Sequence, residues 1–99
     1  MGYEYIATPT NPFTPAVVAK VLLSLTRLDD MLVVRESDSQ LGLAFKRNSS
    51  LQEDVTVVAQ PGSIYIVFHS FLREEREQLL SYLKAQLRGE GVECEFLEM

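Results

Sequence analysis

The strongest constraint on the fold is a pair of short apolar runs that flank Pro61-Gly62. Residues 54–60 and 63–69 both alternate apolar with other side chains, a period typical of strands with one buried face. If Pro61 and Gly62 form a two-residue loop, the predicted pairs are Ala59 with Ile64, Val57 with Ile66 and Val55 with Phe68. This pattern predicts a β-hairpin. Because an L-Pro-Gly turn suits type I or II geometry better than the primed types of short hairpins, we allow for a bulge.

Two amphipathic helices are predicted on either side of this region. Thr14 followed by Pro15 is typical of an N-cap and first helical residue, and the helix should run to about Leu28. Its apolar stripe consists of Val18, Val21, Leu22, Leu25 and Leu28. Ser70 should cap the second helix and Gly89 should stop it. The second stripe consists of Leu72, Leu79, Leu80, Leu83 and Leu87.

The remaining strands complete an α+β order. Further strands are predicted over residues 3–8, 31–35, 40–46 and 92–97. The resulting order is strand, helix, four strands, helix, strand, which predicts a two-layer α+β sandwich with a mainly antiparallel sheet and both helices on one face. The two strand-helix-strand ends resemble the split unit of ferredoxin-like folds, with two additional strands between them. That resemblance concerns topology and carries no function.

Size and charge limit the function classes. The 99 residues suffice for one domain, spanning 1–99, and 46% hydrophobic residues are typical of a globular protein. A net charge of −5 disfavours nucleic-acid binding. The N-terminus lacks signal-peptide character and no apolar run is long enough for a membrane span, so a cytoplasmic protein is expected. The single cysteine, Cys94, leaves no internal disulfide and no cysteine cluster for zinc.

The sheet face opposite the predicted core is a candidate contact surface. It should carry Thr56, Val58, Tyr65, Val67 and His69, together with Gly42 and Ala44 from the preceding strand. A solvated sheet face usually carries more charge, and here only Lys46 at one end is formally charged. The functional interpretation is an interface with another protein or with a second copy of the chain. The alternative is a surface packed under the long loop, with Leu51 folded over it.

No residue pattern indicates an active site. His69 is the only histidine, and we interpret it as structural, whereas Cys94 should share the core face with Val92 and Phe96 and be an inert buried thiol. The acidic pairs, Glu53-Asp54 among them, lack the spacing of a calcium loop and are interpreted as solvated turns and loops. No metal or cofactor is therefore expected.

These observations favour a small, acidic, non-enzymatic protein-binding module. It would engage a basic protein as inhibitors, immunity proteins and secretion chaperones do, with charge speeding the encounter. The contact would use the sheet face or, as an acidic alternative, Glu93, Glu95 and Glu98 near the C-terminus. The runner-up is a dimeric ferredoxin-like domain that binds a small ligand, or carries out simple chemistry, in a cleft near His69. A third possibility is a structural subunit of a larger assembly.

Overall fold

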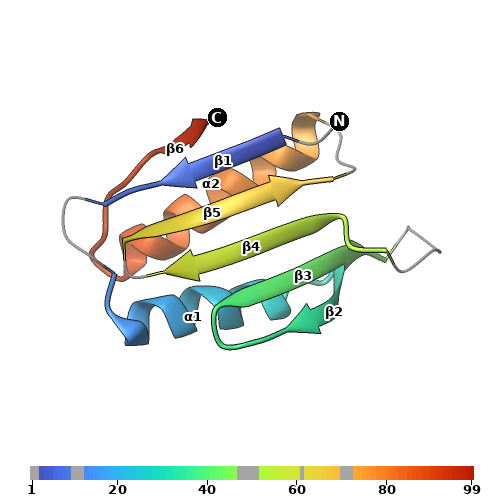
Figure 1. Ribbon diagram of the computed structural model, residues 1–99, viewed down its shortest axis with the longest axis horizontal. Helices are drawn as coiled ribbons and strands as arrows, with labels where there is room; N and C mark the ends of the chain where they lie inside the picture. Colours follow the sequence, from blue (N-terminus) through green and yellow to red (C-terminus); the bar gives the residue numbers. More distant parts are fainter. Residues whose placement is uncertain (1–2, 10–12, 47–51, 61, 70–72) are drawn as a thin grey trace.

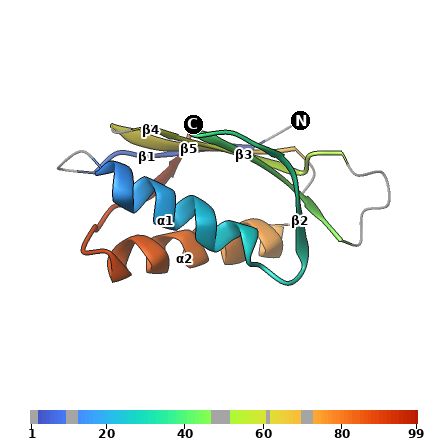
Figure 2. The same cartoon turned by 90° about the horizontal axis from the view of Figure 1, so that it is seen from below.

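The computed structural model describes residues 3–9, 13–46, 52–60, 62–69 and 73–99, and these residues form the predicted α+β sandwich. Six strands make one sheet and two helices lie together on one of its faces (Figures 1 and 2). In chain order the elements are β1 (Tyr3–Ala7), α1 (Pro15–Thr26), β2 (Met31–Glu36), β3 (Gln40–Phe45), β4 (Val55–Gln60), β5 (Ser63–Phe68), α2 (Arg73–Gly89) and β6 (Phe96–Glu98).

The predicted hairpin register is confirmed. All pairings in the sheet are antiparallel and the strand order is β2-β3-β4-β5-β1-β6. Val57 lies opposite Ile66, both fully buried, and Gln60 lies opposite Ser63 with no shift between them. The two-residue loop therefore needs no bulge, although Pro61 itself lies outside the described residues. The N-terminal strand β1 lies between β5 and β6, and its Tyr5 pairs with Ile66 of β5 on one side and with Glu98 of β6 on the other.

Helix α1 begins as predicted and ends two residues early. The Thr14 hydroxyl accepts the Val17 N–H at 3.2 Å, and Pro15 occupies the first turn. The Thr26 hydroxyl donates to the Leu23 carbonyl at 2.6 Å, and Arg27 N donates to the Ser24 carbonyl three residues back. Such bonds tighten the last turn, so the α-helical pattern stops at Thr26 rather than Leu28.

Helix α2 buries Leu79, Leu83 and Leu87, but the residue that terminates it is not the predicted one. Gly89 is its last helical residue, and the left-handed position belongs to Gly91, with φ of 80°. Val92 N donates to the Leu87 carbonyl at 2.9 Å and Gly91 N to the Arg88 carbonyl at 3.0 Å. This pair of bonds is the Schellman motif, which needs a glycine two residues later than expected. The predicted cap Ser70 and the first stripe residue Leu72 lie outside the described residues.

The closing strand is also shorter than predicted. It covers Phe96–Glu98, starting four residues later and ending one residue later than the predicted 92–97. Val92 N is used in the helix cap, and the Glu95 carboxylate pairs with Lys84 of α2 at 2.5 Å. The predicted alternation nevertheless holds, since Val92, Cys94 and Phe96 all pack against the core. That core fills the space between the sheet and the helices, with Leu25, Leu43, Ile64, Ile66, Phe68 and Leu83 among its most buried members.

The helix terminus provides a first test. Replacing Gly91 with Ala should lower the free energy of unfolding by about 1 kcal/mol, because a Cβ disfavours the left-handed conformation. The matched change Gly89→Ala lies in open space at a helical position and should be neutral or stabilising by up to about 1 kcal/mol. Urea unfolding measures both. Equal effects of the two substitutions would contradict the assignment of the terminus.

Candidate functional site

The sheet face turned away from the helices carries the predicted contact residues. Thr56, Val58, Tyr65 and Val67 alternate with fully buried neighbours on β4 and β5 and are all partly exposed, and His69 at the end of β5 is exposed. Figure 2 shows both helices on the other side of the sheet. The structure thus brings these five residues together on one face, while their role in binding stays a prediction.

A row of apolar side chains crosses this face. Val58 lies opposite Tyr65, Tyr65 opposite Ile6, and Ile6 opposite Leu97. We call these four residues the apolar row. Leu97, at the end of the row, is 63% exposed. Ile6 and Leu97 were missed because their membership depends on β1 lying beside β5 and β6 lying beside β1, an order that alternation within each strand does not determine.

Next to the apolar row lies a chain of hydrogen-bonded polar side chains. The Arg35 guanidinium holds the Glu53 carboxylate through two bonds, Nε to Oε1 at 3.0 Å and the second nitrogen to Oε2 at 3.2 Å. The Thr56 hydroxyl donates to Glu53 Oε2 and lies 2.9 Å from His69 Nε2. Since a hydroxyl has a single proton to donate, His69 Nε2 carries the hydrogen and donates to Thr56. We call these four residues the polar chain.

A β-bulge positions Arg35 for this pairing. Met31 pairs with Phe45 on the core side, and strict alternation would return residue 35 to that side. The register shifts between Val33 and Arg35, so Arg35 instead lies opposite Gly42 on the open face. The interpretation of Glu53-Asp54 as a solvated pair is wrong, because Glu53 binds Arg35 and Asp54 is 2% exposed. The buried Asp54 carboxylate accepts the Phe45 N–H at 2.8 Å.

Gly42 provides the space for the Glu53 side chain. A Cβ on Gly42 would lie 2.0 Å from Glu53 Oε1, so the carboxylate rests directly on the glycine backbone. Both Gly42 and its neighbour Ala44 are buried, which corrects the expectation that they belong to the open surface. The open part of the face therefore begins at β4. Leu51, the alternative cover for this face, lies outside the described residues.

The charged groups of the open face interact with one another. The hydrogen bond from Arg35 holds the pKa of Glu53 below its usual value, against the opposing effect of burial, and Thr56 and His69 act in the same direction as Arg35. The Tyr65 hydroxyl donates to the Glu4 carboxylate, and this bond raises the pKa of Tyr65. The formal charges on the described part of the face, Arg35 and Lys46 against Glu4 and Glu53, cancel.

The acidic alternative surface is partly neutralised. Glu95 pairs with Lys84 at 2.5 Å, and Glu90 nearby in the chain pairs with Lys20 at 3.0 Å. Glu93 and Glu98 are exposed. The C-terminal carboxylates therefore offer a weaker concentration of negative charge than their number in the sequence indicates.

The predicted separation of Cys94 and His69 is confirmed. Cys94 packs against the core on the helix side, whereas His69 contacts Thr56 on the open face. Burial raises the pKa of the Cys94 thiol, which reduces the reactive thiolate at neutral pH. Within residues 3–9, 13–46, 52–60, 62–69 and 73–99, no group of three or more histidine, cysteine or acidic side chains could hold a metal ion.

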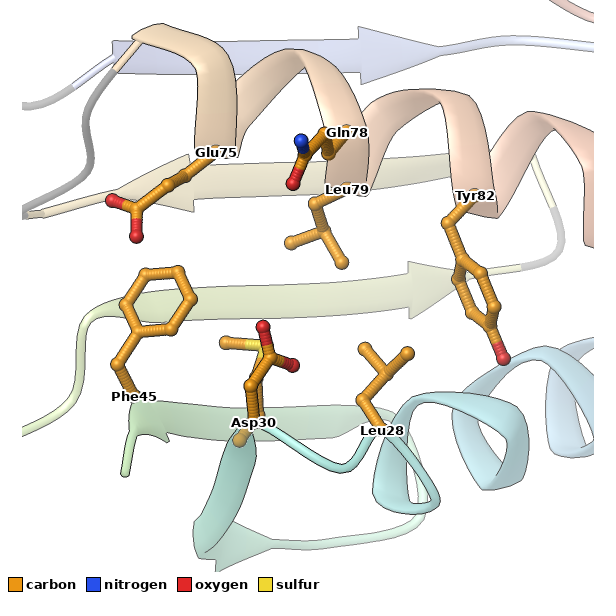
Figure 3. A pocket seen from close by; sticks show the side chains of 8 residues that line it. Leu28, Asp30, Phe45, Glu75, Gln78, Leu79 and Tyr82 are labelled. Carbon is orange, nitrogen blue, oxygen red and sulfur yellow. The ribbon is translucent and has the colours of Figure 1, made fainter. Parts of the chain in front are cut away.

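Several hollows lie elsewhere on the part of the molecule that the structure describes. One of about 240 Å³ lies between the two helices and the adjoining ends of β2 and β3 (Figure 3). A second is shallow and follows the outer surface of α2, and a third of about 330 Å³ separates α1 from the β2–β3 turn. His69 lines none of these three hollows, and the small-ligand cleft beside it stays a prediction.

Comparison with models of known protein families, with curated proteins and with solved structures found no significant match. Neither helix in the described part of the chain has the length and apolar character needed to cross a membrane.

The pairing of Glu53 makes stability depend on pH. Because the pKa of Glu53 is lower in the folded state, its contribution is fully present above the usual value of about 4.3 and is lost as pH falls through the folded pKa. Glu53→Gln should cost about 0.5–1 kcal/mol at pH 7, and the gap from wild type should close below about pH 4. Urea unfolding between pH 3 and 7 measures it. In an Arg35→Gln background, Glu53→Gln should change the free energy of unfolding much less. An unchanged effect in that background would contradict the role of Arg35.

The contact between Gly42 and Glu53 gives a coupled prediction. Gly42→Ala should cost about 1 kcal/mol, because the added Cβ displaces the carboxylate from Arg35. In a Glu53→Ala background the same change should be neutral or stabilising by about 0.5 kcal/mol, since Ala restricts the unfolded chain more than Gly does. A double-mutant cycle in urea measures the coupling. A similar cost in both backgrounds would show that the obstacle is not Glu53.

Proposed function

We propose that this protein is a non-enzymatic protein-binding module whose contact surface is the open face of the sheet, and that the partner on this face is a second copy of the chain. The observation that carries the proposal is the apolar row beside a polar chain whose charges are already paired. Burying such a surface costs less than burying the same charges unpaired, because its polar groups keep their hydrogen bonds to one another when water leaves.

Charge favours a second copy as the occupant. The chain has a net charge of −5, so two copies repel each other over most of their surfaces. On the open face the described charges cancel, which makes it the surface where two copies can approach with least repulsion. A two-fold axis through the sheet would place each Tyr65 near its mate and bring the two apolar rows together.

The area of the open face limits the expected affinity of the dimer. The open part of the face consists of β4, β5, β1 and β6, which lie about 4.8 Å apart and are about three to six residues long, so it projects to roughly 300 Å². Typical stable interfaces bury about 800 Å² per partner, so a reversible dimer of roughly micromolar affinity is expected rather than an obligate one. This estimate disfavours the structural-subunit alternative.

A basic partner remains part of the proposal, in the manner of inhibitors, immunity proteins or secretion chaperones. Because the charges on the open face cancel, the acidic excess of the chain lies on its other surfaces, which stay accessible when the sheet faces pair. The non-enzymatic part is supported by the positions of Cys94 and His69 on opposite sides of the sheet, where they cannot act as nucleophile and base together.

Sedimentation velocity over a range of about 1–200 μM tests the pairing. Wild type should pass from monomer to dimer within this range. Val58→Asp should weaken association at least about tenfold, because it places two carboxylates in the buried centre of the interface. Leu23→Asp, the same kind of change at a 51% exposed position on α1, should associate like wild type. A wild type that stays monomeric, or a Val58→Asp variant that still pairs, would overturn the proposal.

A further inference from the structure

The hollow between the two helices, the end groove, has an apolar floor. Met31 from β2, Phe45 from β3 and Leu79 from α2 line it, and each is less than 8% exposed. These side chains belong to the core and are held in place by its packing. The groove therefore exposes a small piece of the hydrophobic core between the last turn of α1 and the first half of α2 (Figure 3).

Carboxylates stand on opposite sides of this floor. Figure 3 shows Asp30 reaching into the space from the start of β2 and Glu75 reaching toward Phe45 from α2. The Asp30 carbonyl accepts the Lys46 N–H at 2.9 Å, which ties this end of β2 to the end of β3. Among the residues that the structure describes, the Asp30 carboxylate makes no ion pair. The groove thus combines an apolar base with a negatively charged rim.

An aromatic ring forms one end wall. The Tyr82 hydroxyl donates to the Ser24 carbonyl of α1 at 3.1 Å, so the ring spans the two helices. This hydrogen bond fixes the position of the ring. Because the Tyr82 hydroxyl already has its hydrogen-bond partner, it needs none from a ligand. With Phe45 on the floor, two aromatic rings border the groove, and such rings attract cations and stack with planar guanidinium groups.

The volume limits what can enter. At about 240 Å³ the groove is smaller than the roughly 300–1,000 Å³ of sites that enclose a whole small molecule. It has room for one long side chain. A purely apolar group would leave the Asp30 carboxylate desolvated without a partner, whereas arginine has an apolar stem for the floor and a planar cation for the rim.

We propose that the end groove binds an arginine side chain from a basic segment of a partner protein. The stem packs on Met31, Phe45 and Leu79, and the guanidinium lies at the rim, with Asp30 as its main carboxylate. Arginine is favoured over lysine because the guanidinium can stack on an aromatic ring while pairing with a carboxylate. The exposed Glu74, in the neighbouring shallow hollow, attracts the flanking basic residues, whereas Glu77 beside it is already paired with Arg73 at 3.2 Å. This site lies on the helix side of the sheet and does not depend on dimer formation.

An NMR titration tests the proposal. The probes are three acetylated and amidated pentapeptides with glycine at four positions and arginine, lysine or citrulline at the centre. The arginine peptide should shift the amide signals of Met31, Phe45 and Leu79 saturably, with a dissociation constant on the order of 1 mM. Lysine should bind at least about threefold more weakly. Citrulline, which has the same shape without the charge, should not bind measurably.

Matched protein variants locate the charge. Asp30→Asn should weaken arginine-peptide binding by about three- to tenfold, whereas Asp38→Asn, the same charge change at the exposed β2–β3 turn, should weaken it by less than about 1.5-fold. Native spectra of both free variants confirm that they are folded. Equal effects of the two variants, equal binding of citrulline, or shifts outside the groove would overturn the proposal. Sedimentation of the same variants reports the dimer separately, so either proposal can fail alone.

Discussion

The pairing of β4 with β5 is the constraint on which the rest of the structure depends. Val57 opposite Ile66 places two fully buried side chains at the centre of the core, and β3 and β1 add to the outer edges of this hairpin. Because side chains alternate across a strand, a slip of one residue would bury Thr56 and expose Val57. The same register therefore sets both the hydrophobic core and the composition of the open face.

The polar chain shows how local irregularity builds a surface on this regular frame. A bulge in β2 turns Arg35 outward, Gly42 leaves room for the Glu53 carboxylate, and Thr56 links that carboxylate to His69. Each side chain forms a hydrogen bond with the next, and the Arg35 and Glu53 charges pair within the face. No external counterion is needed for them. This arrangement supports the proposed contact of the face with a second copy of the chain.

The two proposed surfaces lie on opposite sides of the sheet and differ in chemistry. The open face is electrically balanced and apolar along one row, whereas the end groove joins an exposed patch of core to carboxylates on its rim. A dimer formed through the open faces would leave both end grooves outward. Such a dimer could engage two basic segments at once, and linkage of the two sites would strengthen binding without any new contact.

The sequence by itself determined the element order, the hairpin register and the side of the sheet on which Val58, Tyr65 and Cys94 lie, because these follow from local periodicity. Tertiary structure alone decided that β1 and β6 extend the apolar row, that Arg35 reaches Glu53, and that Asp30 and Tyr82 border one groove. It also placed the left-handed residue that caps α2 at Gly91 rather than at Gly89. These features join residues far apart in the chain or depend on a single backbone irregularity, and periodicity within one segment contains no information about either.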